Sequence, residues 1–179
     1  MQRRNLIKGF IALGACAICA RAGIADEGVH WSYGGKNGPE HWGALDGANA
    51  ACSAGVQQSP LNLTGAIKAD IPQIGIDWKA GGGAVVNNGH TIQINLPEGS
   101  TLTRGGKAYD LLQFHFHAPS EHLVEGKTFP MEVHFVHKNP ESGALGVLGV
   151  FLTPGAKNET FASLAAAFPA EAGGKASVG

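Results

Sequence analysis

Apolar and polar residues alternate along several stretches in the middle of the chain, which is typical of β-strands. In residues 90–96, isoleucines and a leucine are interleaved with polar side chains. Because successive side chains of a strand point to opposite faces, this alternation predicts a strand with one apolar face. The same alternation returns in residues 111–117 and 131–136, and glycine-rich turns at 81–83 and 88–89 separate the first strands.

The rest of the chain indicates turns and one helix. Residues 31–61 contain Gly-Gly, Asn-Gly-Pro and Ser-Pro steps, which predict a turn-rich segment. Residues 159–168 are the one clear helix candidate, with Asn158 as its N-cap. Residues 173–179 end on no element boundary. Together these patterns predict a mostly β domain, all-β or α+β.

The first 22 residues predict an export signal peptide, which is removed and takes no part in the fold. Basic residues precede the apolar run 9–20, and Ala20-Arg21-Ala22 offers a small-x-small cleavage site, with Gly23-Ile24-Ala25 as a second candidate. The apolar run is too short for a membrane span, which needs about 20 residues. We therefore expect no stable membrane span. Export to the periplasm or the medium would use the Sec route or, through Arg3-Arg4, the twin-arginine route.

The mature chain, residues 26–179, is expected to be one glycine-rich, acidic domain. The full sequence has 179 residues, of which 44% are hydrophobic, 15% are charged and 27 are glycine. Removing the signal takes four of the 13 basic residues and none of the 14 acidic ones, which leaves a net charge of about −5. This charge excludes nucleic acid as a partner, because phosphate binding requires a basic surface. Cys52 is left without a partner cysteine.

Three histidines on the two central strands are the strongest chemical signal in the chain. His115 and His117 alternate with phenylalanines in residues 111–117, and His134 lies opposite in phase to Val133 and Phe135. A catalytic zinc ion takes three protein ligands, often all histidine, and keeps a fourth position open to water. We therefore predict a Zn²⁺ site formed by His115, His117 and His134.

Two polar residues stand at the spacing needed to orient these histidines. Gln113 lies two residues before His115, and Glu132 lies two residues before His134, so each shares a strand face with its histidine. A zinc-bound histidine usually gives its second ring N–H to such an acceptor. Gln113 and Glu132 are therefore the predicted acceptors.

Two other interpretations of these residues remain. The histidines could be half-buried polar residues of an ordinary strand pair. His115-x-His117-x-x-x-Glu121 is also the core of the cupin metal motif, in which the glutamate is itself a ligand. The flanking glycines miss their cupin spacing, because Tyr109 and Thr128 stand in their places. A cupin-type metal enzyme is therefore disfavoured.

The sequence blocks around this site resemble those of an α-class carbonic anhydrase of the bacterial, exported kind. The resemblance runs from about His30 to Leu152. There are departures: Ala118 stands where many members have tryptophan, and Gln93 where some have asparagine, but neither position is a ligand. The blocks that carry the resemblance are, in order, residues 30–42, 57–63, 87–90, 113–122, 132–137 and 147–152.

The resemblance implies both a fold and an activity. The fold would be a single domain built on a large, mainly antiparallel twisted central sheet with few short helices. The activity would be that of a lyase: zinc-dependent, reversible hydration of carbon dioxide to bicarbonate and a proton, with a zinc-bound hydroxide as the nucleophile. Carbon dioxide and bicarbonate are then the expected small-molecule partners, and a homodimer is compatible with the family.

The resemblance also assigns roles to individual residues. His90 matches the proton shuttle, although the adjacent Asn88-Gly89 turn leaves the direction of its ring open. Glu121 resembles the glutamate that accepts a threonine hydroxyl hydrogen in the family. His122 and His137 receive no chemical role. The remaining assignments are Tyr33, Asn88 and Gln93 to the water network, and Val136 and Val147 to the walls of the carbon dioxide pocket.

The family domain continues beyond the length of this sequence, so the resemblance implies an incomplete domain over residues 26–179. Residues 153–179 contain neither the threonine that orients the hydroxide in the family nor a partner for Cys52. We therefore expect a fragment of low stability and little activity. A non-catalytic, carbonic-anhydrase-like binding module is the other alternative, although such relatives usually lose a zinc histidine and all three are present.

Overall fold

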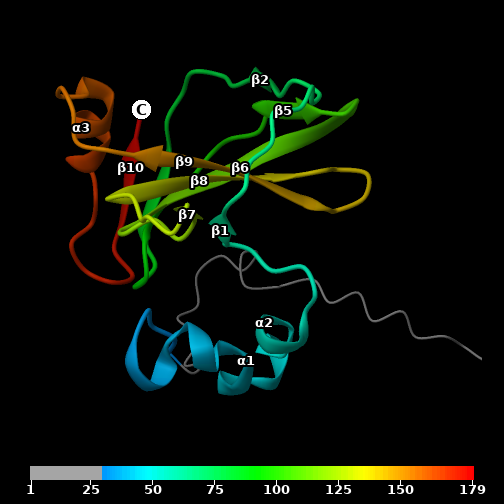
Figure 1. The fold of residues 1–179 in the computed structure, drawn as a ribbon. Helices are drawn as coiled ribbons and strands as arrows, with labels where there is room; N and C mark the ends of the chain where they lie inside the picture. Colours follow the sequence, from blue (N-terminus) through cyan, green and yellow to red (C-terminus); the bar gives the residue numbers. More distant parts are fainter. Residues whose placement is uncertain (1–29) are drawn as a thin grey trace, which may run out of the picture.

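The computed structural model describes residues 30–179, whose fold is shown in Figure 1. The predicted signal peptide, residues 1–22, and its alternative cleavage after residue 25 lie outside the described residues. Export of the chain therefore stays a prediction.

One eight-stranded antiparallel sheet forms the body of the described residues, as Figure 1 shows. The strand order is β10-β3-β4-β6-β5-β2, and β8 pairs with β6 and with β9. β6 pairs with β5 through its first residues, with β4 through its later residues, and with β8 along its other edge. The strands are β2 (Gly75–Asp77), β3 (Gly83–Asn87), β4 (Ile92–Asn95), β5 (Thr101–Arg104), β6 (Lys107–His117), β8 (Met131–Lys138), β9 (Leu145–Leu152) and β10 (Lys175–Val178).

Short helices and one small parallel strand pair complete the described fold. The N-terminal helical segment lies below the sheet in the view of Figure 1, and α3 lies beside β10. No helix of residues 30–179 is long and apolar enough to cross a membrane. The fold is thus mostly β with few short helices, as predicted. These elements are η2 (Gly35–Asn37), η3 (Pro39–His41), α1 (Trp42–Leu45), η4 (Gly47–Asn49), α2 (Ala51–Ala54), β1 (Asn62–Leu63), β7 (Leu123–Val124) and α3 (Glu159–Ala165).

The phenylalanine face of β6 and β8 is a packed face of the sheet, as the alternation predicts. The rings of Phe114 and Phe135 lie opposite each other with centroids 5.3 Å apart, and Phe116 meets Phe161 of α3 at 5.6 Å. α3 begins after Asn158, whose side-chain oxygen accepts a hydrogen bond of 2.9 Å from the N–H of Phe161. The predicted N-cap is therefore confirmed. The helix is shorter than predicted, because it ends at Ala165 and not at residue 168.

Strand β10 (Lys175–Val178) lies within residues 173–179, a segment in which the sequence pattern predicts no strand. Lys175–Val178 pairs antiparallel with β3, and Val178 lies opposite Gly83. The backbones approach closely, because a Cβ at Gly82 would collide with the carbonyl of Val178. The four residues are too few and too mixed to show a period of their own. Pairing with the free edge of β3 decides their structure.

Replacing a core side chain of β4 should destabilise the fold strongly. Ile94 is only 1% exposed, so Ile94→Ala should lower the free energy of unfolding by about 2–5 kcal/mol through lost burial and a residual cavity. Ile67→Ala is the matched control, because Ile67 is 87% exposed and its loss should cost less than about 0.5 kcal/mol. Denaturant unfolding followed by circular dichroism measures both changes. Equal losses in the two variants would contradict this placement of the core.

Candidate metal centre

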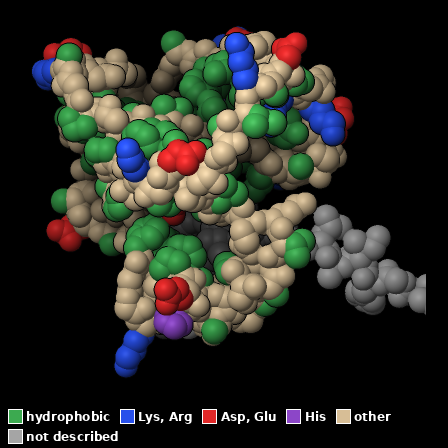
Figure 2. Space-filling model, in the orientation of Figure 1, with side chains coloured by type: hydrophobic (Ala, Val, Ile, Leu, Met, Phe, Trp, Pro, Cys, Tyr) green, Lys and Arg blue, Asp and Glu red, His purple; other side chains and the backbone are tan. Residues whose placement is uncertain are grey.

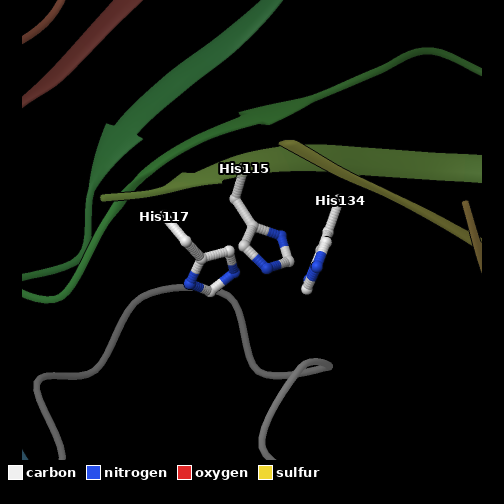
Figure 3. Close-up of side chains that lie close together, drawn as sticks. All are labelled: His115, His117 and His134. Atoms are coloured by element: carbon white, nitrogen blue, oxygen red, sulfur yellow. The ribbon is translucent and has the colours of Figure 1, made fainter. Parts of the chain in front are cut away.

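The pairing of β6 with β8 brings the three predicted histidines together, as Figure 3 shows. His115 lies directly opposite His134 in the antiparallel register, and His117 follows on the same face of β6. The ring centroids are 5.5 Å apart for His115 and His134, 4.9 Å for His115 and His117, and 4.6 Å for His117 and His134. One ring nitrogen of each lies within 4.8 Å of the others, which is the spacing of a group that could hold a metal ion.

The predicted acceptors fix which nitrogen of each ring faces the centre. Oε1 of Gln113 lies 2.9 Å from Nδ1 of His115, which leaves Nε2 of His115 free. Oε1 of Glu132 lies 2.9 Å from Nε2 of His134, which leaves Nδ1 of His134 free. The latter contact is short but poorly aligned, since Nε2 of His134 makes no hydrogen bond of good geometry. A small rotation of the imidazole ring would align this contact.

Tyr33 fixes the third ring. Its hydroxyl lies 3.0 Å from Nδ1 of His117 and donates a hydrogen bond of 2.7 Å to Oε1 of Glu121. A tyrosine hydroxyl has one hydrogen to donate, so Nδ1 of His117 must donate to the tyrosine oxygen. Nε2 of His117 is therefore unprotonated, and it is buried without a hydrogen-bond partner among the described residues. Burial, followed by the hydrogen bond to Glu121, raises the pKa of Tyr33, which keeps the hydroxyl protonated.

Burial keeps two of the imidazoles neutral. Burial, followed by repulsion from His117 and His134, lowers the pKa of His115 to about 4. Burial, followed by repulsion from His134, lowers the pKa of His117 to about 4. Because an imidazole binds a metal only through an unprotonated nitrogen, both rings are ready ligands at neutral pH. A buried Nε2 without a partner and three converging lone pairs fit a zinc ion well.

Glu132 is a carboxylate held in place on several sides. It is 1% exposed, and its Oε2 accepts hydrogen bonds of 3.0 Å from the N–H groups of Glu121 and His122. Nδ1 of His122 lies 2.7 Å from its Oε1. Burial alone would raise the pKa of Glu132, but the hydrogen bond from the His122 backbone, followed by the close contacts of the His134 and His122 side chains, outweighs it and lowers the pKa. Glu132 therefore stays ionised and can orient His134.

Two residues that support Glu132 were not found from the sequence. His122, which receives no role there, is close enough to Glu132 and His134 to form a second candidate group for a metal. The first group is the better site, because the Glu132 oxygens already accept several hydrogen bonds. Gly149 on β9 lies opposite His134, and a Cβ there would come within 2.6 Å of Oε1 of Glu132. The need for glycine at position 149 follows from the close packing of β9 on β8, which the sequence alone does not reveal.

Apart from Tyr33, the residues predicted for the proton path lie near the start of β4 and in the turn before it. His90 is exposed and its ring stacks on Trp31, with centroids 4.1 Å apart and planes at 10°. Burial against its neighbours, followed by repulsion from His30, lowers the pKa of His90. The side chain of Asn88 accepts from the N–H of His90 at 3.0 Å and so shapes the turn. Gln93 pairs with His115 across the strands and therefore shares its face.

The two predicted pocket valines are direct neighbours on the same face as the histidines. Val136 on β8 pairs with Val147 on β9, two residues along each strand from the pair of His134 and Gly149. Val136 is 5% exposed, whereas Val147 is 55% exposed. The other central histidine, His137, is buried on the opposite side, where its Nδ1 lies 2.9 Å from the carbonyl oxygen of Phe135.

An antiparallel sheet that presents three histidines, each with a partner at its outer nitrogen, is an arrangement that could hold a metal ion. Residues 37–173 match the family model described as eukaryotic-type carbonic anhydrase. The chain belongs to this family, the α-class carbonic anhydrases. The cupin-type alternative is therefore wrong.

Sequence relatives and solved structures agree with this membership. A carbonic anhydrase of Neisseria gonorrhoeae is 43% identical over 164 residues, which cover 91% of this chain and 64% of the relative. A carbonic anhydrase of Pectobacterium carotovorum is 38% identical, and the match covers 92% of this chain and 67% of that relative. A hyperthermostable carbonic anhydrase from a hydrothermal vent chimney superposes with a TM-score of 0.77 at 41% identity, covering 83% of this chain and 66% of that one. The chain thus spans about two thirds of the length of these relatives.

The metal-free chain should lose stability as the pH falls from about 6.5 towards 4. In this window the unfolded state protonates His115 and His117, whose ordinary pKa is about 6.5, whereas the folded state resists protonation because both pKa values are about 4. The melting temperature in the presence of a chelator measures this dependence. His115→Asn should show a shallower fall than the parent. Identical pH profiles would contradict the depressed pKa of His115.

Proposed function

We propose that the chain's three-histidine site binds zinc and serves the reversible hydration of carbon dioxide to bicarbonate and a proton. The observation that carries this proposal is the convergence of one ring nitrogen from each of the three histidines within 4.8 Å, on the sheet of a carbonic anhydrase fold. Zinc held by neutral imidazoles supplies an activated water at neutral pH, as is already known for carbonic anhydrases. Membership of the family supports the same activity.

The chain's own residues prepare this site before the metal arrives. Gln113 and Glu132 hold the outer nitrogens of His115 and His134, so the inner nitrogens need no reorientation. The low pKa of His115 and that of His117 mean that no proton has to be displaced from either ring at pH 7. The ionised Glu132 places a negative charge behind His134 and holds the orientation of its ring.

Val136 and Val147 are proposed to bind the substrate. They pair across β8 and β9 next to His134 and present only hydrocarbon to the space beside the metal site. Carbon dioxide carries no net charge or dipole, so it can bind against an apolar wall that offers no hydrogen-bonding groups. The exposed fraction of Val147 shows that this wall is open to solvent in the described residues.

His90 is proposed to move the product proton to buffer. Its pKa is below the ordinary value near 6.5, so the ring releases a captured proton readily at neutral pH. Its exposure, and its stacking on Trp31 rather than on the sheet, leave the ring in contact with solvent. Tyr33, Asn88 and Gln93 are proposed to order the intervening water. Tyr33 and Gln93 lie beside the three histidines, and Asn88 lies beside His90. Water molecules leading from the three histidines to His90 would pass these residues in that order.

We also propose that the chain acts outside the cytoplasm. The basic N-terminus followed by an apolar run and a small-x-small step supports removal of a signal peptide during export. Cys52 is exposed and makes no disulfide within the described residues.

The purified chain should bind one zinc ion, and His117→Ala should lose it. Removing one of three imidazoles leaves two protein ligands from the set, too few for a stable tetrahedral site. His41→Ala is the control, because His41 is an exposed histidine of η3 outside the cluster. Elemental analysis after dialysis reports the zinc content of each variant. Full zinc content in His117→Ala would refute this ligand set.

His90→Ala should slow carbon dioxide hydration in weak buffer by about tenfold or more, because a positioned proton carrier is removed. Added imidazole should restore the rate, since it can carry the same proton. Isotope exchange between carbon dioxide and bicarbonate should change little, because it reports the chemistry at the metal alone. If His90→Ala matches the parent in dilute buffer, His90 is only a turn residue.

A further inference from the structure

The hydroxyl group of Thr91, the residue after His90, joins the turn of residues 88–91 to strand β6. Its Oγ1 donates a hydrogen bond of 2.5 Å to the carbonyl oxygen of Phe116 and accepts one of 3.1 Å from the N–H of the same residue. Phe116 stands between two of the metal-site histidines. We propose that Thr91 is a positioning residue for His90, because its hydroxyl holds the turn that carries His90 against the strand that carries two metal-site histidines. This inference rests on the roles of His90 and of the three histidines in the proposed function.

The Thr91 hydroxyl continues the ladder between β4 and β6 beyond its last backbone pair. That ladder ends at Gln93, which lies opposite His115. The next residue of β6 is Phe116, whose N–H and C=O groups both meet Oγ1 of Thr91. A hydroxyl has one hydrogen to donate, and the carbonyl oxygen of Phe116 is closer to Oγ1 than that of Ile92, which is 3.3 Å away. One side chain therefore does at Phe116 what a backbone pair does in the rest of the ladder.

The backbone that carries His90 is bound to Thr91 within the turn itself. Oδ1 of Asn88 accepts hydrogen bonds of 3.0 Å from the N–H of His90 and of 2.9 Å from the N–H of Thr91. The N–H of Asn88 donates to the carbonyl oxygen of Thr91 at 3.1 Å. Asn88 and Thr91 thus close the turn with His90 between them. The backbone of His90 can move relative to β6 only if one of these hydrogen bonds or those to Phe116 break.

The ring of His90 contacts a different part of the chain. It stacks on Trp31, which belongs to the N-terminal helical segment, residues 30–54. A pocket of about 350 Å³ lies between this segment and the loop that follows β6, and Figure 2 shows the surface hollowed between the segment and the sheet. Trp31 therefore orients the ring, whereas Thr91 joins the backbone of His90 directly to the strand of the metal-site histidines.

Proton transfer depends on the distance that Thr91 holds. A displacement of about 1 Å in a reacting group can lower a rate by about a hundredfold, because the transfer path no longer aligns. Thr91→Val keeps the branched shape of the side chain but replaces the hydroxyl with a methyl group, which neither donates nor accepts a hydrogen bond. The turn would then lose its two hydrogen bonds to Phe116, and His90 would no longer keep one distance from the metal site.

Amide hydrogen exchange tests this attachment without relying on activity. Thr91→Val should speed exchange of the Phe116 N–H by about fivefold or more, the factor that the loss of one ordinary hydrogen bond implies. Thr91→Ser retains the hydroxyl and should protect this N–H as the parent does. Thr101→Val is the matched control, because Thr101 lies opposite Asp110, towards the other end of β6. Equal protection of Phe116 in Thr91→Val and in the parent would refute the attachment.

Hydration kinetics test the positioning role. In weak buffer Thr91→Val should slow carbon dioxide hydration by about three- to tenfold, less than His90→Ala, because the proton carrier is displaced and not removed. Added imidazole should restore the rate, isotope exchange between carbon dioxide and bicarbonate should change little, and Thr91→Ser and Thr101→Val should match the parent. Circular dichroism shows whether each variant is folded, and Thr91→Ala replaces Thr91→Val if the latter is not.

The double variant distinguishes positioning of His90 from a general loss of structure. If Thr91 acts through His90, adding Thr91→Val to His90→Ala should cause no further loss of rate. A general defect would lower the rate of isotope exchange as well and would add to the loss in His90→Ala. Either of these two results would overturn the positioning role.

The outcomes also separate this inference from the proposed function. If His90→Ala slows hydration in weak buffer and Thr91→Val does not, the shuttle stands and Thr91 does not position it. If His90→Ala matches the parent, the shuttle assignment is wrong and this inference falls with it. If the parent chain hydrates no carbon dioxide, both are refuted.

Discussion

The register between β6 and β8 is the constraint on which the rest of the site depends. His115 lies opposite His134, while Phe114 lies opposite Phe135 on the other face. A slip of one residue would send the histidines into the aromatic face and the phenylalanines towards the metal. The apolar contacts of Phe114 and Phe135, continued by Phe116 against α3, therefore fix the position of the ligands as well as stabilising the fold.

The sequence predicted those parts of the site that lie within one strand. Gln113 and His115 are two residues apart on the same face, so alternation alone pairs them, and the same holds for Glu132 and His134. It missed contacts that join distant segments, such as His122 with Glu132, because neither periodicity nor spacing reports them. It also missed β10, whose four residues become a strand only by adding to the free edge of β3. Local patterns predicted the central strands, and chain topology decided the rest.

Burial has opposite consequences for the histidines and for Glu132. Removing water disfavours the charged form of every group, so the pKa of His115 and that of His117 fall and both rings become neutral ligands. The same burial would neutralise Glu132 if the N–H groups of Glu121 and His122 did not donate to its Oε2. These donors come from the loop between β6 and β8. That loop thus sets the charge of the site, while the strands set its geometry.

The two carboxylates that flank the histidines differ in how completely their oxygens are satisfied. Both oxygens of Glu132 have donors close by, so Glu132 can orient His134 but has little capacity left for a metal. Glu121 has one oxygen bound by Tyr33 and the other facing the unprotonated nitrogens of His117 and His134. Because the loop places the N–H of Glu121 on Glu132, one segment carries both the donor that satisfies the first carboxylate and the side chain of the second. The backbone of Glu121 is therefore held by the same carboxylate that orients His134.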